Sequence, residues 1–248
     1  MNTIYILWLR QVKKYFRSRS RIVGSLAQPI LFLVAFGFGF GSLYSKAGGG
    51  NYIQFLAPGI ISMSVLFTSI FTGIEIIWDR QFGFLKETLV APVSRFEIML
   101  GRTLGGATVG AIQGIIVFLL TLIVGFRPTN FLLLPFALIF ILLIGIIFTS
   151  LGTAIASKLE DMQGFQLIMN FLVMPTFFLS GALFPLKGLP KVMEIITKAD
   201  PLAYGVDGLR GTLIGAWNFN LSLDVTILVI ISIVFLSIGS YLFSKIQV

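Results

Sequence analysis

Six long stretches of the sequence contain no charged residue, and they restrict the chain to a membrane protein. They cover residues 22–45, 47–74, 103–126, 128–157, 162–186 and 225–244. A helix needs about 20 apolar residues to cross the roughly 30 Å hydrocarbon core of a bilayer, and each stretch is long enough. Charged residues make up only 11% of the chain, too few to cover a soluble fold. We therefore predict an all-α membrane protein with six transmembrane helices.

Basic residues are divided unequally between the two sides of the predicted spans. An even number of spans places both termini on one side of the membrane. Twelve Lys and Arg residues then lie on the side of the termini and six on the other side. The twelve are Arg10, Lys13, Lys14, Arg17, Arg19, Arg21, Arg80, Lys86, Arg95, Arg102, Lys158 and Lys245; the six are Lys46, Arg127, Lys187, Lys191, Lys198 and Arg210. The positive-inside rule predicts a multi-pass protein of the cell membrane with both termini in the cytoplasm. The net charge of +8 thus reflects topology, and we expect no nucleic-acid partner.

Missing residue types exclude several kinds of chemistry. The sequence has no His and no Cys, which removes the usual zinc and haem sites, thiol nucleophiles and disulfides. It also has no Gly-Lys followed by Ser or Thr, the core of a Walker-type phosphate loop. We predict no catalytic residue, metal or cofactor of its own. The chain is not expected to be an enzyme, and any ATP would be bound by a partner.

Residues 1–21 form the predicted cytoplasmic lead-in to a transmembrane domain at 22–248. One helical face carries Ile4, Leu7, Trp8, Val12, Tyr15 and Phe16, and the opposite face carries Arg10, Lys13, Lys14 and Arg17. This pattern predicts an amphipathic interfacial helix whose basic face suits anionic membrane lipids. Two roles remain open: a plain surface anchor, or an elbow that also touches a cytoplasmic motor subunit.

The segment at 75–102 concentrates charge between two apolar spans. It holds eight charged residues: Glu75, Asp79, Arg80, Lys86, Glu87, Arg95, Glu97 and Arg102. The spacing of Trp78, Phe82, Leu85 and Leu89 predicts one short helix over 78–91, which Pro92 ends. Ser94 and Glu97 form a capping box that starts the next helix. Such a helical knob is suited to receive force from another protein, although helical loops also occur without that role.

Sequence motifs in this loop resemble the type-2 ABC exporter permeases, specifically the daunorubicin-resistance-like group. The motifs are Asp79-Arg80, Gly83, Leu85, the run from Leu89 to Arg95, and Gly101-Arg102. The resemblance continues through Phe178-Leu179-Ser180-Gly181, Pro185, Leu189-Pro190, Pro201 to Tyr204, and Asp207 to Arg210, over nearly the whole chain. Two positions depart from the family pattern. Lys86 stands where the family commonly has an acidic residue, and Phe84 stands where a small hydroxyl residue is usual.

This resemblance implies partners and site residues. The loop would be the coupling helix seated in an ABC ATPase subunit, with docking residues Trp78, Arg80, Phe82, Gly83, Leu85, Lys86, Glu87, Leu89 and Pro92. A second copy of the chain would complete the pathway along the interface between the copies. Residues 187–224 would be re-entrant half-helices that close its outer end, with gate residues Pro201, Tyr204, Asp207 and Arg210. Weaker candidates for the substrate pathway are Glu75, Phe178 and Ser180.

The outer segment itself predicts two short helices. One covers 190–198, and Asp200-Pro201 is typical of the N-cap and first residue of a second helix through Arg210, in which Asp207 and Arg210 could pair. A surface hairpin is the alternative to a gate. A gate would place Gly205, Gly208 and Gly211 against neighbouring helices.

Two further features lie in the predicted spans: a row of glycines in the third span and an acidic residue in the second. Gly101, Gly105, Gly106, Gly110 and Gly114 follow helical spacing, which favours close helix packing, either within the chain or along a dimer seam or substrate wall. Glu75 lies near the cytoplasmic end of the second span. It is expected to be a snorkelling interfacial acid, with a proton relay or cation ligand as the alternative.

These observations favour the membrane-spanning permease subunit of an ATP-driven exporter for an amphipathic drug-like molecule or lipid. The alternative is an ion-coupled secondary transporter or channel without an ATPase, which would be expected to show paired intramembrane charges and two similar halves. An intramembrane enzyme is a third possibility, with only Glu75 near a span to act as its carboxylate.

Overall fold

A computed structural model describes residues 3–46, 48, 50–129, 131–186, 188 and 190–246. All regular structure in these ranges is helical. The longer helices are α1 (Thr3–Arg17), α2 (Arg19–Gly39), α4 (Tyr52–Phe71), α7 (Arg95–Val124), α8 (Leu134–Lys158), α9 (Met162–Leu179), α11 (Pro201–Ile214) and α12 (Leu221–Ser244). The shorter ones are α3 (Gly41–Lys46), η1 (Thr72–Ile74), α5 (Glu75–Gln81), α6 (Phe84–Val90), η2 (Phe131–Leu133) and α10 (Lys191–Ala199).

Within the described ranges, six helices are long and apolar enough to cross a membrane, as expected: 19–39, 52–81, 95–124, 131–158, 162–179 and 221–244. The boundaries differ from the predicted ones in three main ways. The first span ends at Gly39, the third already begins at Arg95 because of its capping box, and the fifth ends at Leu179. Ala47, Lys187 and Leu189, which belong to the predicted second span and outer segment, lie outside the described residues.

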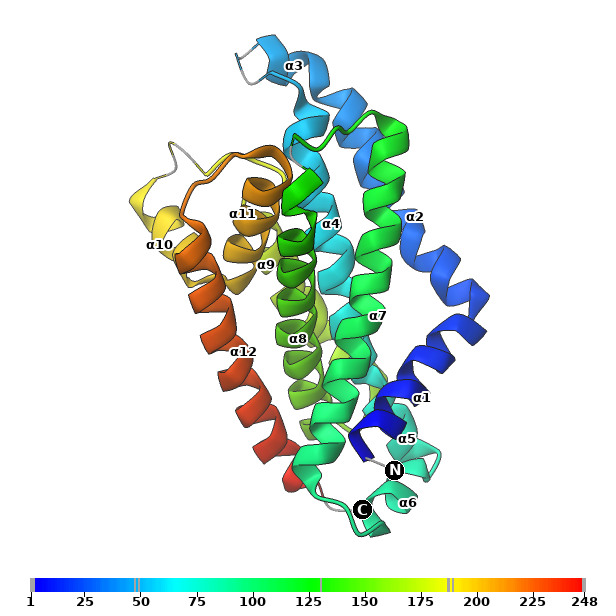
Figure 1. Cartoon of the computed structure of the whole chain (residues 1–248). Helices are drawn as coiled ribbons and strands as arrows, with labels where there is room; N and C mark the ends of the chain where they lie inside the picture. The colour runs from blue at the N-terminus through cyan, green and yellow to red at the C-terminus, as the bar shows by residue number, and fades with distance from the viewer. Residues whose placement is uncertain are drawn as a thin grey trace.

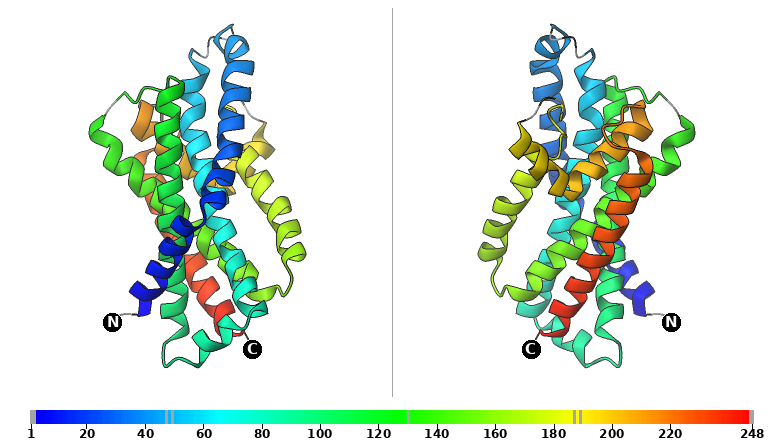
Figure 2. Two further views of the ribbon diagram at one scale, coloured as in Figure 1. Left: turned by 90° about the vertical axis from the view of Figure 1, so that its right-hand side faces the viewer. Right: turned by 90° about the vertical axis from the view of Figure 1, so that its left-hand side faces the viewer.

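Helices α4, α7 and α8 form the centre of the bundle. Helix α8 packs against α4, α7, α11 and α12, and α2 packs against α4. Most side chains of α4 are buried, whereas those of α2, α9 and α12 are largely exposed. Helix α9 stands at the outside of the bundle (Figure 2). The two chain ends lie at the same end of the molecule (Figure 1), called here the inner end, and α3, α10 and α11 lie toward the other, called the outer end.

Glycines on α7 pack against helices of the same chain. A Cβ at Gly105 would lie 2.6 Å from Cβ of Gln11 on α1, and Gly101 faces the same helix. Gly106 and Gly114 face the opposite way, toward Thr149 of α8 and toward α4. The strip therefore packs within the chain, as one of the two interpretations predicted, and it seats α1 against α7.

Helix α1 is amphipathic, as predicted, but it packs on the bundle. Leu7, Gln11 and Tyr15 are buried against it, and the Tyr15 hydroxyl donates to Oε1 of Gln113 at 2.6 Å. Phe16, which the pattern placed on the apolar face, is exposed. Helix α1 is therefore anchored to the third span by packing and by a buried hydrogen bond.

The outer segment forms the two predicted short helices, α10 and α11. Asp200 caps α11 by accepting a hydrogen bond from the Leu202 amide at 2.9 Å, and Pro201 is its first residue. Gly205 faces Ile144 and Gly208 faces Phe140, both on α8. Gly211 instead faces Trp217, which follows α11 in the chain and is not part of a neighbouring helix.

Candidate functional site

The inner loop consists of two helices, so the prediction of one helix over 78–91 is wrong. Helix α5 continues the second span, and α6 begins after a break at Phe82 and Gly83. Gly83 has a φ of +80°, a left-handed conformation that glycine adopts without the steric cost of a Cβ. As a result Trp78 belongs to the span, while Leu85 and Leu89 belong to a separate helix.

The predicted end of this loop is confirmed. Helix α6 ends at Val90, before Pro92. The Ser94 hydroxyl accepts from the Glu97 amide at 3.1 Å, and the Glu97 carboxylate accepts from the Ser94 amide at 3.1 Å. This capping box fixes the start of α7, so the loop is anchored on both sides by continuous helices.

Apolar side chains are exposed on this loop. Phe82 is 72% exposed, Val90 is 85% exposed and Phe84 is also exposed, whereas Leu85 is fully buried and anchors α6. Lys86, Glu87 and Pro92 are exposed as well, and Leu89 is partly buried. Exposed apolar side chains grouped at the end of a bundle and rimmed by charges are typical of a protein-binding surface. We call Phe82, Phe84, Lys86, Glu87 and Val90 the inner knob.

Two predicted docking residues make contacts within the chain. Arg80 donates to the carbonyl oxygens of Ser157 and Leu159, each at 3.1 Å, and so ties α5 to the turn after α8. The indole N–H of Trp78 donates to Sδ of Met162 at 2.8 Å. These two side chains therefore hold the knob on the bundle, although Trp78 is itself 41% exposed.

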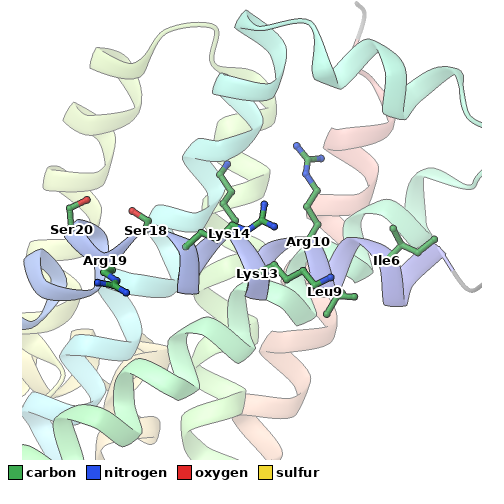
Figure 3. Close-up of a pocket in the computed structure, with 9 residues that line it drawn as sticks. Ile6, Leu9, Arg10, Lys13, Lys14, Ser18, Arg19 and Ser20 are labelled. Carbon is green, nitrogen blue, oxygen red and sulfur yellow. The ribbon is translucent and has the colours of Figure 1, made fainter.

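A cluster of ion pairs joins α1 and α2 to the base of the knob. Glu75 pairs with Lys14 at 3.2 Å and with Arg21 at 2.7 Å. Asp79 pairs with Arg10 at 3.0 Å and with Arg102 on α7. Figure 3 shows Arg10 and Lys14 extending from the same side of α1.

Glu75 is buried, so the expectation of a snorkelling acid is wrong. Its side chain is 6% exposed, and two cations neutralise it in place of water. The sequence does contain a signal for these ion pairs. Glu75 and Asp79 are four residues apart on α5, and Arg10 and Lys14 are four residues apart on α1. Residues four apart share one helical face, but sequence reasoning cannot tell which two faces meet.

Two hollows lie beside this cluster. One, of about 960 Å³, runs along the basic side of α1 and includes Lys13, Arg17 and Arg19 (Figure 3). The other, of about 360 Å³, lies between the start of α2 and α4. Its polar lining comes from Tyr15, Arg21, Ser25, Gln28, Ser64 and Thr68, and its apolar lining from Gly24, Pro29, Met63, Phe67 and Phe71. The second hollow can thus accommodate a molecule with both polar and apolar parts.

The expected pairing of Asp207 with Arg210 is wrong. Arg210 is buried, donates to the carbonyl oxygen of Gly181 at 2.9 Å, and has its guanidinium carbon 4.0 Å from the centroid of the Phe55 ring. Asp207 instead accepts from the Asn218 and Phe219 amides, each at 2.8 Å. Each side chain therefore attaches α11 to a different part of the chain.

The other predicted gate and pathway residues have separate positions. The Tyr204 hydroxyl donates to the carbonyl oxygen of Lys198 at 2.7 Å, which closes the corner between α10 and α11. Lys198 is exposed, and its hydrogen bond with Glu194 raises the pKa of its amino group. Phe178 is half exposed on α9, while Ser180 is fully buried and donates to the carbonyl oxygen of Phe177 at 2.8 Å.

An all-helical bundle with six span-capable helices and a transporter-family match defines a multi-pass membrane protein. The chain belongs to the ABC-2 type transporter family, whose profile matches residues 2–214. It is similar to Nodulation protein J of Rhizobium leguminosarum bv. viciae, at 29% identity over 86% of this chain and 82% of the relative. It is also similar to ycf38, named as a transport permease, of Cyanophora paradoxa (30% identity, 98% of this chain, 88% of the relative) and Porphyra purpurea (31%, 93% and 83%). These relatives support a transport permease component as the class of protein.

Proposed function

We propose that the chain is the membrane-spanning permease subunit of an ATP-driven ABC exporter. The observation that carries this proposal is the inner knob, an exposed apolar surface fixed to two spans at the basic end of the bundle. No Walker-type phosphate loop occurs in the sequence, so an ABC ATPase subunit would supply ATP hydrolysis. Phe82, Phe84 and Val90 would fill a cleft of that subunit, with Lys86 and Glu87 at its rim.

The inner end would face the cytoplasm of a cell membrane. Six basic residues occur within residues 10–21 alone, and Arg80, Lys86 and Arg95 belong to the loop at the same end. This asymmetry supports a cytoplasmic position for both termini. The basic side of α1 would then meet anionic lipid headgroups of the inner leaflet.

Movement of the knob would reach the spans through buried ion pairs. A shift of α5 displaces Glu75 and Asp79, and these carboxylates are held by Lys14, Arg21 and Arg102. The three cations belong to α1, α2 and α7, so a displacement of α5 would move these three helices with it. Breaking such pairs leaves buried charges unpaired, which makes rigid-body motion the less costly response.

A second copy of the chain would complete the pathway. The face formed by α2 and α9 is exposed in one copy, with Leu31, Phe38 and Phe171 each more than half exposed. The two helices touch each other through Phe32 on α2 and Phe177 on α9, whose ring centroids lie 6.0 Å apart. A homodimer over these two helices would place the hollow between α2 and α4 beside the interface.

The transported molecule is proposed to be an amphipathic drug-like compound or lipid. The hollow between α2 and α4 has Arg21, Gln28 and Ser64 among its polar groups, and Met63 and Phe67 among its apolar ones. This mixture suits a ligand with a polar head and an apolar body.

Copurification tests the proposal. The tagged full chain is expressed with its ABC ATPase, and ATPase recovery and ATP hydrolysis are measured for Phe82→Ala and Val90→Ala. We expect recovery to fall about tenfold for the pair of changes, the equivalent of roughly 1.4 kcal/mol. Val192→Ala is the matched control, because Val192 is 69% exposed on α10 toward the other end. Full transport by the chain without any ATP-binding partner would overturn the proposal.

A further inference from the structure

The hollow between α2 and α4 carries its charge at one end. Its polar lining comes from one face of α2, with Arg21, Ser25 and Gln28, and from Ser64 and Thr68 of α4. Arg21 is the one charged side chain among the described residues that line it. Because Arg21 lies in the first turn of α2, the inner end of this hollow is positive.

The guanidinium of Arg21 has unused hydrogen-bond donors. A guanidinium carries five N–H donors, and within the described ranges its one acceptor is Oε1 of Glu75, 2.7 Å from Nη1. The side chain of Arg21 is 30% exposed. Its remaining N–H groups can therefore bind an acceptor in the hollow, and their planar arrangement matches the oxygens of a phosphate or carboxylate.

The acid beside Arg21 is not available to a cationic ligand. Both oxygens of Glu75 are already occupied, Oε1 by Arg21 and Oε2 by Lys14 at 3.2 Å. The Glu75 side chain is only 6% exposed, and it is not part of the lining of the hollow. A cationic head group would thus have to displace one of two cations that belong to the chain.

The ion-pair cluster as a whole has more cations than acids. It contains two carboxylates, Glu75 and Asp79, and four cations, Arg10, Lys14, Arg21 and Arg102. Four cations and two carboxylates leave a surplus of two positive charges. An anionic group bound at Arg21 would offset part of this surplus, whereas a cationic group would be repelled by it.

Apolar side chains follow the length of the same hollow. Met63, Phe67 and Phe71 are spaced by four residues along α4, so they form one stripe, and Pro29 of α2 is also part of the lining. The volume of about 360 Å³ lies in the range of small-molecule sites. The hollow therefore offers a positive end and an apolar wall to one ligand.

We propose that this hollow binds the anionic head group of an amphiphile, with Arg21 as the ligand of a phosphate or carboxylate. The stripe of Met63, Phe67 and Phe71 packs against the apolar part of the molecule, and Glu75 is a positioning residue that holds Arg21. This inference rests on the proposed function, because it takes the hollow as part of the transport pathway. It narrows the transported molecule to an anionic amphiphile and excludes a cationic drug.

Photocrosslinking of the full chain in nanodiscs of zwitterionic lipid tests the choice of head group. Two probes share one diazirine-bearing acyl chain; the first is a lysophosphatidate, and the second has a trimethylammonium head. At equal concentration we expect the phosphate probe to label the lining of the hollow about tenfold more strongly, with competition by unlabelled lysophosphatidate. Equal labelling, or stronger labelling by the trimethylammonium probe, overturns the proposal without the need for a variant.

Substitution of Arg21 tests the ligand itself. We expect Arg21→Gln to lower labelling by the phosphate probe about tenfold, and Arg21→Lys, which keeps the charge without the planar group, to lower it less. Lys158→Gln is the matched control, because it removes an exposed cation at the same end of the bundle. Arg21→Gln combined with Glu75→Gln avoids an acid with only one partner and should show the same loss. Undiminished labelling in this folded double variant contradicts the proposal.

Failure of this inference can be distinguished from failure of the proposed function. A chain that recovers its ATPase but labels equally with both probes disproves the anionic site alone. Loss of ATPase recovery with a retained preference for phosphate disproves the exporter and leaves the site. In a complex that hydrolyses ATP, added ATP should lower labelling of the hollow by the phosphate probe. Labelling that ATP does not change would identify a resident lipid headgroup and overturn the assignment to a transported molecule.

Discussion

Nη1 of Arg21 lies 2.7 Å from Oε1 of Glu75, joining the first residues of the first span to the inner end of the second. The two residues are 54 positions apart, and Lys14 of α1 approaches the other oxygen of the same carboxylate. Glu75 is buried and its partners are partly exposed, so the carboxylate depends on them for its charge compensation. Through Lys14, the N-terminal helix α1 shares this carboxylate with α2 and so packs on the bundle.

The first prediction concerns removal of this carboxylate. Glu75→Gln leaves Arg21 and Lys14 without their acid, and we expect a loss of about 1–3 kcal/mol in the free energy of unfolding. Thermal unfolding in nanodiscs measures it, with Glu87→Gln on the exposed side of α6 as the matched control. The same variant tests a ligand role for Glu75: unchanged export of cationic substrates by a folded Glu75→Gln protein would exclude it.

Glycine spacing leads to the second prediction. A Cβ at Gly105 would lie 2.6 Å from Cβ of Gln11, so Gly105→Val must push α1 away from α7. We expect a destabilisation of about 1–3 kcal/mol, together with a loss of ATPase stimulation in the complex, because α1 carries two of the cations that hold the knob. Gly41→Val, on α3 at the outer end, is the control, since no heavy atom lies within 4 Å of a Cβ there. Normal stability of Gly105→Val would show that α1 is not seated as described.

Much of the fold follows from the sequence because it depends on local patterns. Charge-free length alone predicted six spans, and the capping box at Ser94 and the Asp200-Pro201 signal predicted two helix starts that the structure confirms. The break at Gly83 was missed, although the glycine itself was the signal, since apolar periodicity continued across it. A periodic stripe shows which residues share a face only while the backbone stays helical.

The candidate site was harder to predict, because it depends on which faces meet. Asp207 and Arg210 are three apart and suited to pair, yet the turn at 218–219 and the carbonyl oxygen of Gly181 supply partners that no local rule contains. The same reason explains the ion pairs of Glu75 and Asp79, whose cations come from α1, α2 and α7. Long-range partners of buried charges require the tertiary arrangement.

The third prediction concerns orientation, and the absence of cysteine makes it simple to test. Single cysteines replace Lys86 on the inner knob and Val192 on α10, both exposed positions. A membrane-impermeant maleimide added to intact cells should label Val192→Cys, and should label Lys86→Cys only after the cells are opened. The reverse pattern would place the termini outside the cytoplasm.

The fourth prediction concerns the outer end, where the guanidinium carbon of Arg210 lies 4.0 Å from the centroid of the Phe55 ring. Lysine keeps the charge at this position but loses the planar group that stacks on the ring while donating to Gly181. We expect Arg210→Lys to lower the free energy of unfolding by about 1–3 kcal/mol, and Arg19→Lys, at an exposed arginine, to change it little. Phe55→Leu combined with Arg210→Lys should cost less than the sum of the two single changes, because both remove the same contact. Additive losses in this double-mutant cycle would show that the ring and the guanidinium stabilise the outer end independently.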